Sequence, residues 1–220
     1  DFGRENMMFD GILFDLDGTL WDACPQLTVS WNQALELHRV PRAPLTTQEI
    51  RDCMGLLLRD IAEKLLPMLP VPQQDAVIAD CVRLELEYLA RHGSTLFPRE
   101  EETLAALKEG CPLFIVSNCE DGYIQAFFAG CGTGKYFTDL ESAGKTRLPK
   151  SENIRLVVER NELRNPVYVG DTALDASSAK EAGVAFLHAA YGFGKVEGVP
   201  AVPDFASLPG ALEKLSLQLG

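Results

Sequence analysis

The 220-residue sequence lacks several features that would point to other classes of protein. No apolar run approaches the ~20 residues that a membrane-spanning helix needs, and no stretch has the pattern of a secretory signal. Positive charge is scarce, since 20 Lys and Arg stand against 32 Asp and Glu, for a formal net charge of −12. A nucleic-acid-binding surface needs the opposite balance. We therefore expect a cytoplasmic protein that binds neither membranes nor nucleic acid.

The six cysteines include no CxxC pair, and their spacing suggests neither a zinc site nor a disulfide framework. Several fall on apolar faces, so we interpret them as small buried hydrophobic residues. This usage suits a reducing compartment. Residues 1–6 carry no strand pattern, and we expect the native chain to begin at Met7 or Met8.

The most informative feature is the segment Asp15-Leu16-Asp17-Gly18-Thr19, which directly follows the apolar run Ile12-Leu13-Phe14. Alternation along a strand points Asp15 and Asp17 to the same side. Two neighbouring carboxylates repel each other and lose solvation when buried. Such a pair makes sense with a divalent cation between them, or with one as nucleophile and the other as acid and base. A strand that merely ends in an Asp-Gly turn is the competing interpretation.

Three further polar sites follow apolar runs later in the chain. Ser117 and Asn118 follow the run 113–116, and Lys150 precedes an amphipathic helix. The segment Gly170-Asp171-Thr172-Ala173-Leu174-Asp175 follows the run 167–169. In open α/β sheets, ligands bind at the carboxyl ends of the strands. We therefore expect these side chains to converge on one site.

From about residue 23 to residue 93 the sequence has only helical patterns, interrupted by prolines. We expect an α-helical insertion over 23–93, within an α/β core formed by 1–22 and 94–220. The segments 22–25 and 92–97 would be its hinges, and Gly93 gives the second one backbone freedom. The expected helices of the insertion are 25–39, a short one near 46–47, 57–66 and 73–91, with breaks at Pro41, Pro44, Pro67, Pro70 and Pro72.

After residue 98 the pattern alternates between strands and helices, which predicts a parallel, Rossmann-like sheet. Two glycine-rich segments, 130–135 and 192–195, are not nucleotide-binding motifs: the first lacks P-loop spacing and the second opens no helix. We expect strands near 113–116, 136–140, 167–169 and 184–188, and helices near 100–109, 121–129, 151–161, 173–182 and 208–217.

The ordered set of DxDGT, a strand ending in Ser-Asn, a lysine and GDTxxD resembles the signature of the haloacid dehalogenase (HAD) superfamily. Within it, the chain resembles the phosphoglycolate-phosphatase-like branch with a helical cap, over nearly its whole length after the first few residues. The resemblance implies a Rossmann-like core with an inserted α-helical cap. It also implies a Mg²⁺-dependent phosphatase that hydrolyses a small phosphorylated metabolite through an aspartyl-phosphate intermediate.

By this resemblance, Asp15 is the nucleophile, and Asp17 is the general acid and then the general base. Mg²⁺ would be bound by the carboxylates of Asp15 and Asp171 and by the backbone carbonyl of Asp17. Asp175 would lie near the metal, either orienting its water ligands or binding it directly.

The remaining assignments concern the phosphate and the cap. Ser117 and Lys150 would contact the phosphate, and Lys150 is preferred to the nearby Lys145 because a helix begins immediately after it. The family often has Lys-Pro at this point, whereas Ser151 follows here. Within the possible specificity loop 53–59 of the cap, Arg59 is a candidate for a second anionic group, although a surface arginine is the more ordinary interpretation. The assigned substrate-binding set is Asn118, Gly18, Thr19 and Arg59.

Other activities stay open. Asp17 argues against a phosphonatase or a dehalogenase, because the members of those groups that resemble this chain lack an acid there. A β-phosphoglucomutase-like phosphomutase is the first alternative, although such relatives often carry Val where Thr19 stands. A non-catalytic phosphate-binding regulatory protein is the second. The sequence does not choose among phosphoglycolate, a sugar phosphate, a nucleotide and pyrophosphate as substrate, and nothing in it demands more than a monomer.

Overall fold

The computed structural model describes residues 9–219, so the expected start at Met7 or Met8 lies outside the described part. Its main sheet has six strands in the order β5-β4-β1-β6-β7-β8, and every neighbouring pair is parallel. The predicted parallel α/β fold is therefore confirmed, with β8 as a strand that the sequence did not reveal. The strands are β1 (Gly11–Phe14), β4 (Leu113–Ser117), β5 (Phe137–Ser142), β6 (Pro166–Gly170), β7 (Ala185–Ala189) and β8 (Ala201–Val202).

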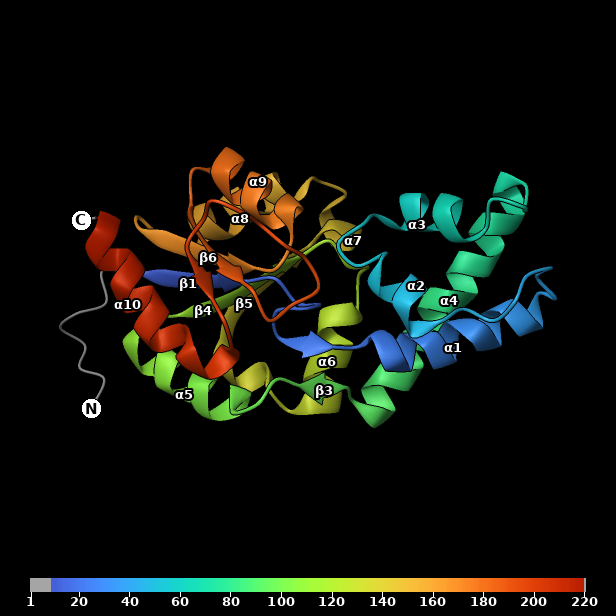
Figure 1. Ribbon diagram of the computed structural model, residues 1–220, viewed down its shortest axis with the longest axis horizontal. Helices are drawn as coiled ribbons and strands as arrows, with labels where there is room; N and C mark the ends of the chain where they lie inside the picture. Colours follow the sequence, from blue (N-terminus) through green and yellow to red (C-terminus); the bar gives the residue numbers. More distant parts are fainter. Residues whose placement is uncertain (1–8, 220) are drawn as a thin grey trace.

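Helices cover both faces of this sheet (Figure 1). Successive residues of β1 point to opposite faces: Leu13 packs with apolar residues of α8 and α9, and Phe14 with those of α5, α6 and α10. Each face of β1 thus buries one apolar layer, which explains its unbroken hydrophobic run. The helices are α5 (Glu100–Gly110), α6 (Tyr123–Cys131), α8 (Lys150–Arg160), α9 (Ala173–Ala182) and α10 (Leu208–Leu219).

A helical segment lies to one side of the sheet (Figure 1). In the sequence it is flanked by two short strands. These strands, β2 (Trp21–Asp22) and β3 (Thr95–Leu96), pair antiparallel. Ser94 Oγ also donates a hydrogen bond to the backbone oxygen of Asp22 at 2.5 Å. The two predicted hinge segments therefore lie side by side, where the chain leaves the sheet and returns to it. The helices of this segment are α1 (Cys24–Leu37), α2 (Thr47–Arg51), α3 (Leu58–Leu65) and α4 (Val71–His92).

Several element boundaries differ from the sequence prediction for simple reasons. Pro72, which was expected to precede the helix as a break, lies instead in the first turn of α4. The N–H groups of a first turn make no hydrogen bond within the helix, so the missing N–H of proline is tolerated there. The helix expected from residue 121 begins at Tyr123, because Gly122 precedes it with a φ of 91°. The four-residue helix α7 (Ala143–Thr146) is too short to show a periodic pattern. All six cysteines are unpaired, as expected.

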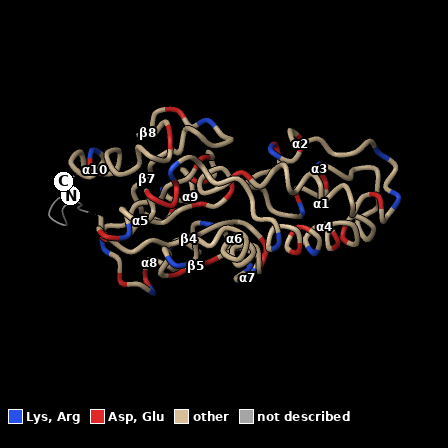
Figure 2. The backbone as a smooth tube through the Cα atoms, turned by 90° about the horizontal axis from the view of Figure 1, so that it is seen from below, with Lys and Arg blue, Asp and Glu red and all other residues tan. Residues whose placement is uncertain are grey.

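The acidic side chains are not gathered in one place. Figure 2 shows Asp and Glu along the whole length of the molecule, interspersed with Lys and Arg. Within residues 9–219, no helix combines the length and apolar character needed to cross a membrane. With a net charge of −12, an anionic ligand has to be attracted by local positive groups.

Candidate active site

Three buried carboxylates meet at the carboxyl ends of β1 and β6. Asp15 directly follows β1, Asp171 directly follows β6, and Asp175 lies in the first turn of α9. The two strands are neighbours in the sheet, so the residues that follow them are brought together. One oxygen atom from each carboxylate lies within 4.8 Å of the others. Such an all-oxygen set suits a hard divalent cation such as Mg²⁺.

Lys150 lies against this carboxylate cluster. Its Nζ is 3.0 Å from Asp15 Oδ1 and 2.6 Å from Asp175 Oδ1, and the lysine is 3% exposed. Burial lowers the pKa of Lys150, but Asp15 and Asp175 raise it more, so the amine stays protonated. Burial and the neighbouring Asp175 raise the pKa of Asp15 to about 7, even though Lys150 lowers it. One ammonium group therefore does not neutralise three carboxylates. A bound cation would supply the missing positive charge.

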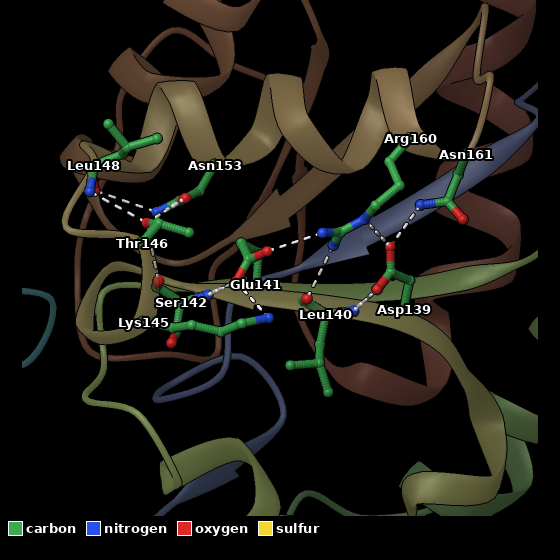
Figure 3. Close-up of polar contacts among 10 residues, drawn as sticks. All are labelled: Asp139, Leu140, Glu141, Ser142, Lys145, Thr146, Leu148, Asn153, Arg160 and Asn161. Atoms are coloured by element: carbon green, nitrogen blue, oxygen red, sulfur yellow. Dashed lines mark hydrogen bonds and ion pairs between the residues drawn. The ribbon is translucent and has the colours of Figure 1, made fainter.

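Figure 3 shows the contacts of the turn before α8, in which Lys145 lies. Thr146 Oγ1 donates to Asn153 Oδ1 at 2.7 Å, which fixes this turn on the first part of the helix. Lys145 points instead to Glu141, 3.4 Å away, and its side chain is half exposed. Lys150 is the first residue of α8, so the helix begins one residue earlier than the start at Ser151 that the sequence predicts.

The carboxyl group of Asp17 lies outside the three-carboxylate cluster. Its Oδ1 accepts hydrogen bonds from Trp21 Nε1 at 2.8 Å and from Tyr123 Oη at 2.9 Å. Burial and the charge of Asp15 raise the pKa of Asp17 to about 7, while the two donors lower it. A carboxyl group with a pKa near 7 can both give and take a proton at neutral pH. The sequence did not reveal Tyr123, because its contact with Asp17 joins residues 106 positions apart.

Backbone and side-chain donors orient the other two carboxylates. Asp175 Oδ2 accepts from the N–H of Thr172 at 2.9 Å and from its hydroxyl at 2.7 Å, so Asp175 also completes the helix cap of α9. Asp171 Oδ2 accepts from the N–H of Phe193 at 2.7 Å. The glycine-rich segment 192–195 is thus a loop that holds Asp171, a role the sequence analysis missed. Burial and the neighbouring Asp175 raise the pKa of Asp171 to about 6.

Gly18 leaves room for Asp171, which gives a first prediction. It has a φ of +80°, and an added Cβ would lie 2.4 Å from Asp171 Oδ2. Gly183 has a similar φ of +76° but nothing within 4 Å. We expect Gly183→Ala to lower the free energy of unfolding by about 1–2 kcal/mol, the cost of the left-handed backbone. Gly18→Ala should lower it further, because Asp171 must move. Urea unfolding of both variants measures the difference. Equal losses of unfolding free energy would show that Asp171 can move away from the added methyl group at no cost.

Ser117 and Asn118 end β4 beside this cluster. Ser117 is buried and borders the same cavity as Asp15. The side-chain amide of Asn118 donates to the backbone oxygen of Gly55 at 3.1 Å, while its own carbonyl oxygen is buried and has no partner within residues 9–219. Gly55 belongs to the loop between α2 and α3. This hydrogen bond therefore links the sheet to the helical segment.

The helical segment closes a cavity over the ends of β1 and β4. Its volume is about 60 Å³. The sheet side presents Asp15, Asp17 and Ser117, and the facing side includes the loop that begins at Cys53. Trp31 borders the cavity, whereas Trp21 bonds to Asp17.

Arg59 does not border this cavity. It forms ion pairs with Asp75 at 2.8 Å and Glu63 at 3.5 Å, beside a neighbouring groove. Thr19 lies close to Asp171, with 3.5 Å between its hydroxyl and Asp171 Oδ1. The structure thus gathers the predicted site residues of the sheet and leaves Arg59 apart from them.

Comparison with known proteins matches the chain along most of its length. The family model of haloacid dehalogenase-like hydrolases matches residues 12–189. A phosphoglycolate phosphatase from Rhodobacter capsulatus is 33% identical, over 94% of this chain and 98% of its own. The crystal structure of a predicted phosphoglycolate phosphatase from Haemophilus somnus has a TM-score of 0.78 at 25% identity, over 91% of this chain and 96% of its own. A haloacid dehalogenase-like family hydrolase from Streptococcus pneumoniae has a TM-score of 0.77 at 21% identity, over 96% and 98%.

Proposed function

Because the chain belongs to the haloacid dehalogenase-like hydrolase family and is a phosphatase, we propose that it hydrolyses small phosphate monoesters through an aspartyl-phosphate intermediate, with Mg²⁺. The observation that carries this proposal is the contact of Lys150 with Asp15 inside a buried cluster of carboxylates. Asp17 stands beside this cluster with a pKa of about 7. These groups are the nucleophile, the counter-charge and the proton carrier that phosphoryl transfer from an ester needs.

In the proposed reaction, Asp15 attacks the phosphorus atom and the ester P–O bond breaks. The departing alkoxide takes the proton of Asp17, so it leaves as an alcohol. A water molecule then attacks the aspartyl-phosphate and gives its proton to Asp17. Inorganic phosphate leaves, and both carboxyl groups return to their starting states. Dividing the hydrolysis in this way replaces one hard step with two easier ones.

The carboxylate cluster fits Mg²⁺, because its donors are oxygen atoms within 4.8 Å of one another. Asp15, Asp171 and the backbone carbonyl of Asp17 would hold the ion. When bound, it would supply positive charge beside the phosphate. Both oxygens of Asp175 already accept hydrogen bonds, from Lys150 and Thr172. Asp175 would therefore hold Lys150, and would either orient water ligands of the ion or bind it directly.

The phosphate oxygens need donors on their other sides. Ser117 would donate its hydroxyl, the N–H of Asn118 would add a second donor, and Lys150 would neutralise charge. The turn at Gly18 and Thr19 completes this set beside Asp171. Donors arranged around the oxygens stabilise the charge of a loose phosphoryl-transfer transition state.

We also propose that residues 23–93 act as a cap domain on a core of 1–22 and 94–220. The paired strands β2 and β3 form the junction between the two parts. The loop containing Gly55 lies over the cavity and bonds to Asn118. A cap in this place would select the leaving group of the substrate.

Phosphate release from a panel of small esters, with Mg²⁺ and with EDTA, tests this function. We expect turnover with Mg²⁺ and its loss with EDTA. Conversion of a hexose 1-phosphate to the 6-phosphate without free phosphate would instead establish the phosphomutase. Tight binding of one ester without turnover of any would establish the non-catalytic protein.

Tyr123→Phe tests the proton-carrying role of Asp17. The phenol donates to Asp17 Oδ1 and lowers its pKa, because a donor stabilises the ionised carboxylate. Its removal should raise the pKa of Asp17 and move the pH–activity profile toward higher pH by up to about one unit. Tyr136→Phe is the control, since that hydroxyl donates to Glu101 at the surface. Reduced activity with an unchanged pH–activity profile would mean that Tyr123 contributes packing alone and does not set the pKa of Asp17.

A further inference from the structure

The position of Asp17 determines where the leaving group lies. In the proposed reaction Asp17 gives its proton to the departing oxygen, so that oxygen must be next to Asp17. Asp17 borders the cavity between the sheet and the helical segment, together with Asp15 and Ser117. The body of the leaving group therefore extends into this cavity, and the cavity wall selects the substrate. The inference below rests on the phosphatase function proposed above.

The wall of this cavity offers no positive charge to a leaving group. Among the described residues that border it, none is Lys, Arg or His, and two carry a carboxyl group besides Asp15 and Asp17, namely Glu85 and Glu120. The rest of the helical side is mostly apolar, and includes Leu27, Ile50, Met54, Leu56, Leu58 and Ile61. An anionic leaving group would lose water there and gain no counter-charge.

Glu85 is a carboxylic acid on the helical side of this cavity. It lies on α4, is 4% exposed, and accepts a hydrogen bond from Trp31 Nε1 through Oε2. Its other oxygen has no partner among the described residues and is not sealed in the protein. Burial raises the pKa of Glu85 to about 8. An oxygen that is open to the cavity and has no protein partner is available for a hydrogen bond with a ligand.

Two arginines lie near this cavity, and one of them, Arg147, forms an ion pair with Glu120 at 3.8 Å. Arg59 and Arg147 border a neighbouring groove, which neither Asp15 nor Asp17 borders. The hydrogen bond from Asn118 to the backbone oxygen of Gly55 lies between the groove and the cavity. Arg59 is in addition paired with acidic side chains of its own segment. A carboxylate on a leaving group next to Asp17 therefore meets neither arginine.

We propose that this cavity selects phosphate monoesters whose leaving group carries no negative charge and donates a hydrogen bond, from a hydroxyl or an amine, to Glu85. Esters of hydroxy acids, such as phosphoglycolate, are disfavoured, because no Lys, Arg or His among the described residues that border the cavity can pair with their carboxylate. This selection combines an attractive contact to the preferred group with an uncompensated loss of solvation for the wrong one.

Matched pairs of esters test the proposal on the wild-type protein. Within each pair the length is equal and one end differs: 2-hydroxyethyl phosphate or phosphoethanolamine against 2-phosphoglycolate, glycerol 3-phosphate against 3-phosphoglycerate, and sorbitol 6-phosphate against 6-phosphogluconate. With Mg²⁺, we expect kcat/KM to favour the hydroxyl or amine member by about tenfold or more at the preferred length. A hydroxyl preference and an amine preference both support the proposal, and the first pair separates them.

Two results would overturn the inference in different ways. If the acids are hydrolysed equally well or better, the selection by Glu85 is wrong while the phosphatase function stands. If no ester releases phosphate, p-nitrophenyl phosphate included, the proposed function fails and the inference fails with it.

Glu85→Gln assigns the selection to this residue. At a pH above the Glu85 pKa of about 8, the variant removes a negative charge at nearly constant size, so the ratio of kcat/KM between the acid and hydroxyl members should rise about fivefold or more. Glu87→Gln is the matched control, because Glu87 lies on the same helix but pairs with Arg83 at the surface. An unchanged ratio in Glu85→Gln would remove Glu85 from substrate selection. Because the variant is read as a ratio, a general loss of activity does not affect it, and the wild-type comparison does not depend on it.

Discussion

Asp15→Asn should lower kcat by about 10⁴-fold or more while the protein stays folded. The amide of Asn cannot attack phosphorus to form the acyl phosphate, so the first step is lost. Asp121→Asn is the control, because Asp121 is exposed and not part of the cavity wall. Phosphate release measures the effect, and circular dichroism verifies the fold. Activity retained in Asp15→Asn would exclude Asp15 as the nucleophile.

The same variant has an expected effect on stability. The pKa of Asp15 is raised to about 7 in the folded protein, above the unfolded value of about 4. The folded state therefore holds this proton more tightly, and the wild type loses stability as the pH rises from about 4 to 7. Asp15→Asn lacks this loss. In EDTA, its stability relative to the wild type should be greater at pH 8 than at pH 5, as urea unfolding at both pH values would show.

Lys150→Met should be the most destabilising of these variants. It leaves Asp15 and Asp175 buried without the ammonium that contacts both, and breaking a buried ion pair from one side costs about 3–5 kcal/mol. Activity should also fall by about 10²-fold or more, because a charge next to the reacting group is lost. Part of the lost stability should return with Mg²⁺, since binding to the folded state replaces positive charge.

Lys145→Met is the matched control for Lys150→Met. Lys145 is half exposed and contacts Glu141 rather than the cluster, so its loss should cost less than about 1 kcal/mol. Urea unfolding and phosphate release on both variants compare the two lysines. Equal effects would mean that the sequence argument and the geometry have selected the wrong lysine.

The carboxylate site was predictable from the sequence because its residues follow buried strands. A parallel sheet brings the carboxyl ends of neighbouring strands together, so Asp15 and Asp171 had to converge once β1 and β6 paired. Lys150 was recognisable from the helix that begins at it. Here the order of motifs along the chain was sufficient, since each one lies at the end of a regular element.

The cavity wall was not predictable in this way. Tyr123 reaches Asp17 across 106 positions, and no local pattern encodes that contact. Glu85 was noticeable in the sequence as an acid on the apolar face of α4, between Cys81 and Leu89. This pattern does not show whether the face borders a cavity or packs in the core. Arg59, chosen for its charge, is paired within its own segment, and its role in substrate binding stays a prediction, as does the monomeric state.

The antiparallel pair of β2 and β3 bears on how such a protein can evolve. Trp21 is the register partner of Leu96, and paired residues on antiparallel strands have Cα atoms about 4.5–5.5 Å apart. The two chain segments that connect the helical segment to the rest of the protein are therefore paired as β2 and β3. This pairing fixes the distance between them, whatever sequence lies between. If the whole helical segment is exchanged for one of different length or sequence, only the pairing of β2 with β3 has to be preserved. Phosphoryl chemistry and the choice of leaving group can then diverge independently within one chain.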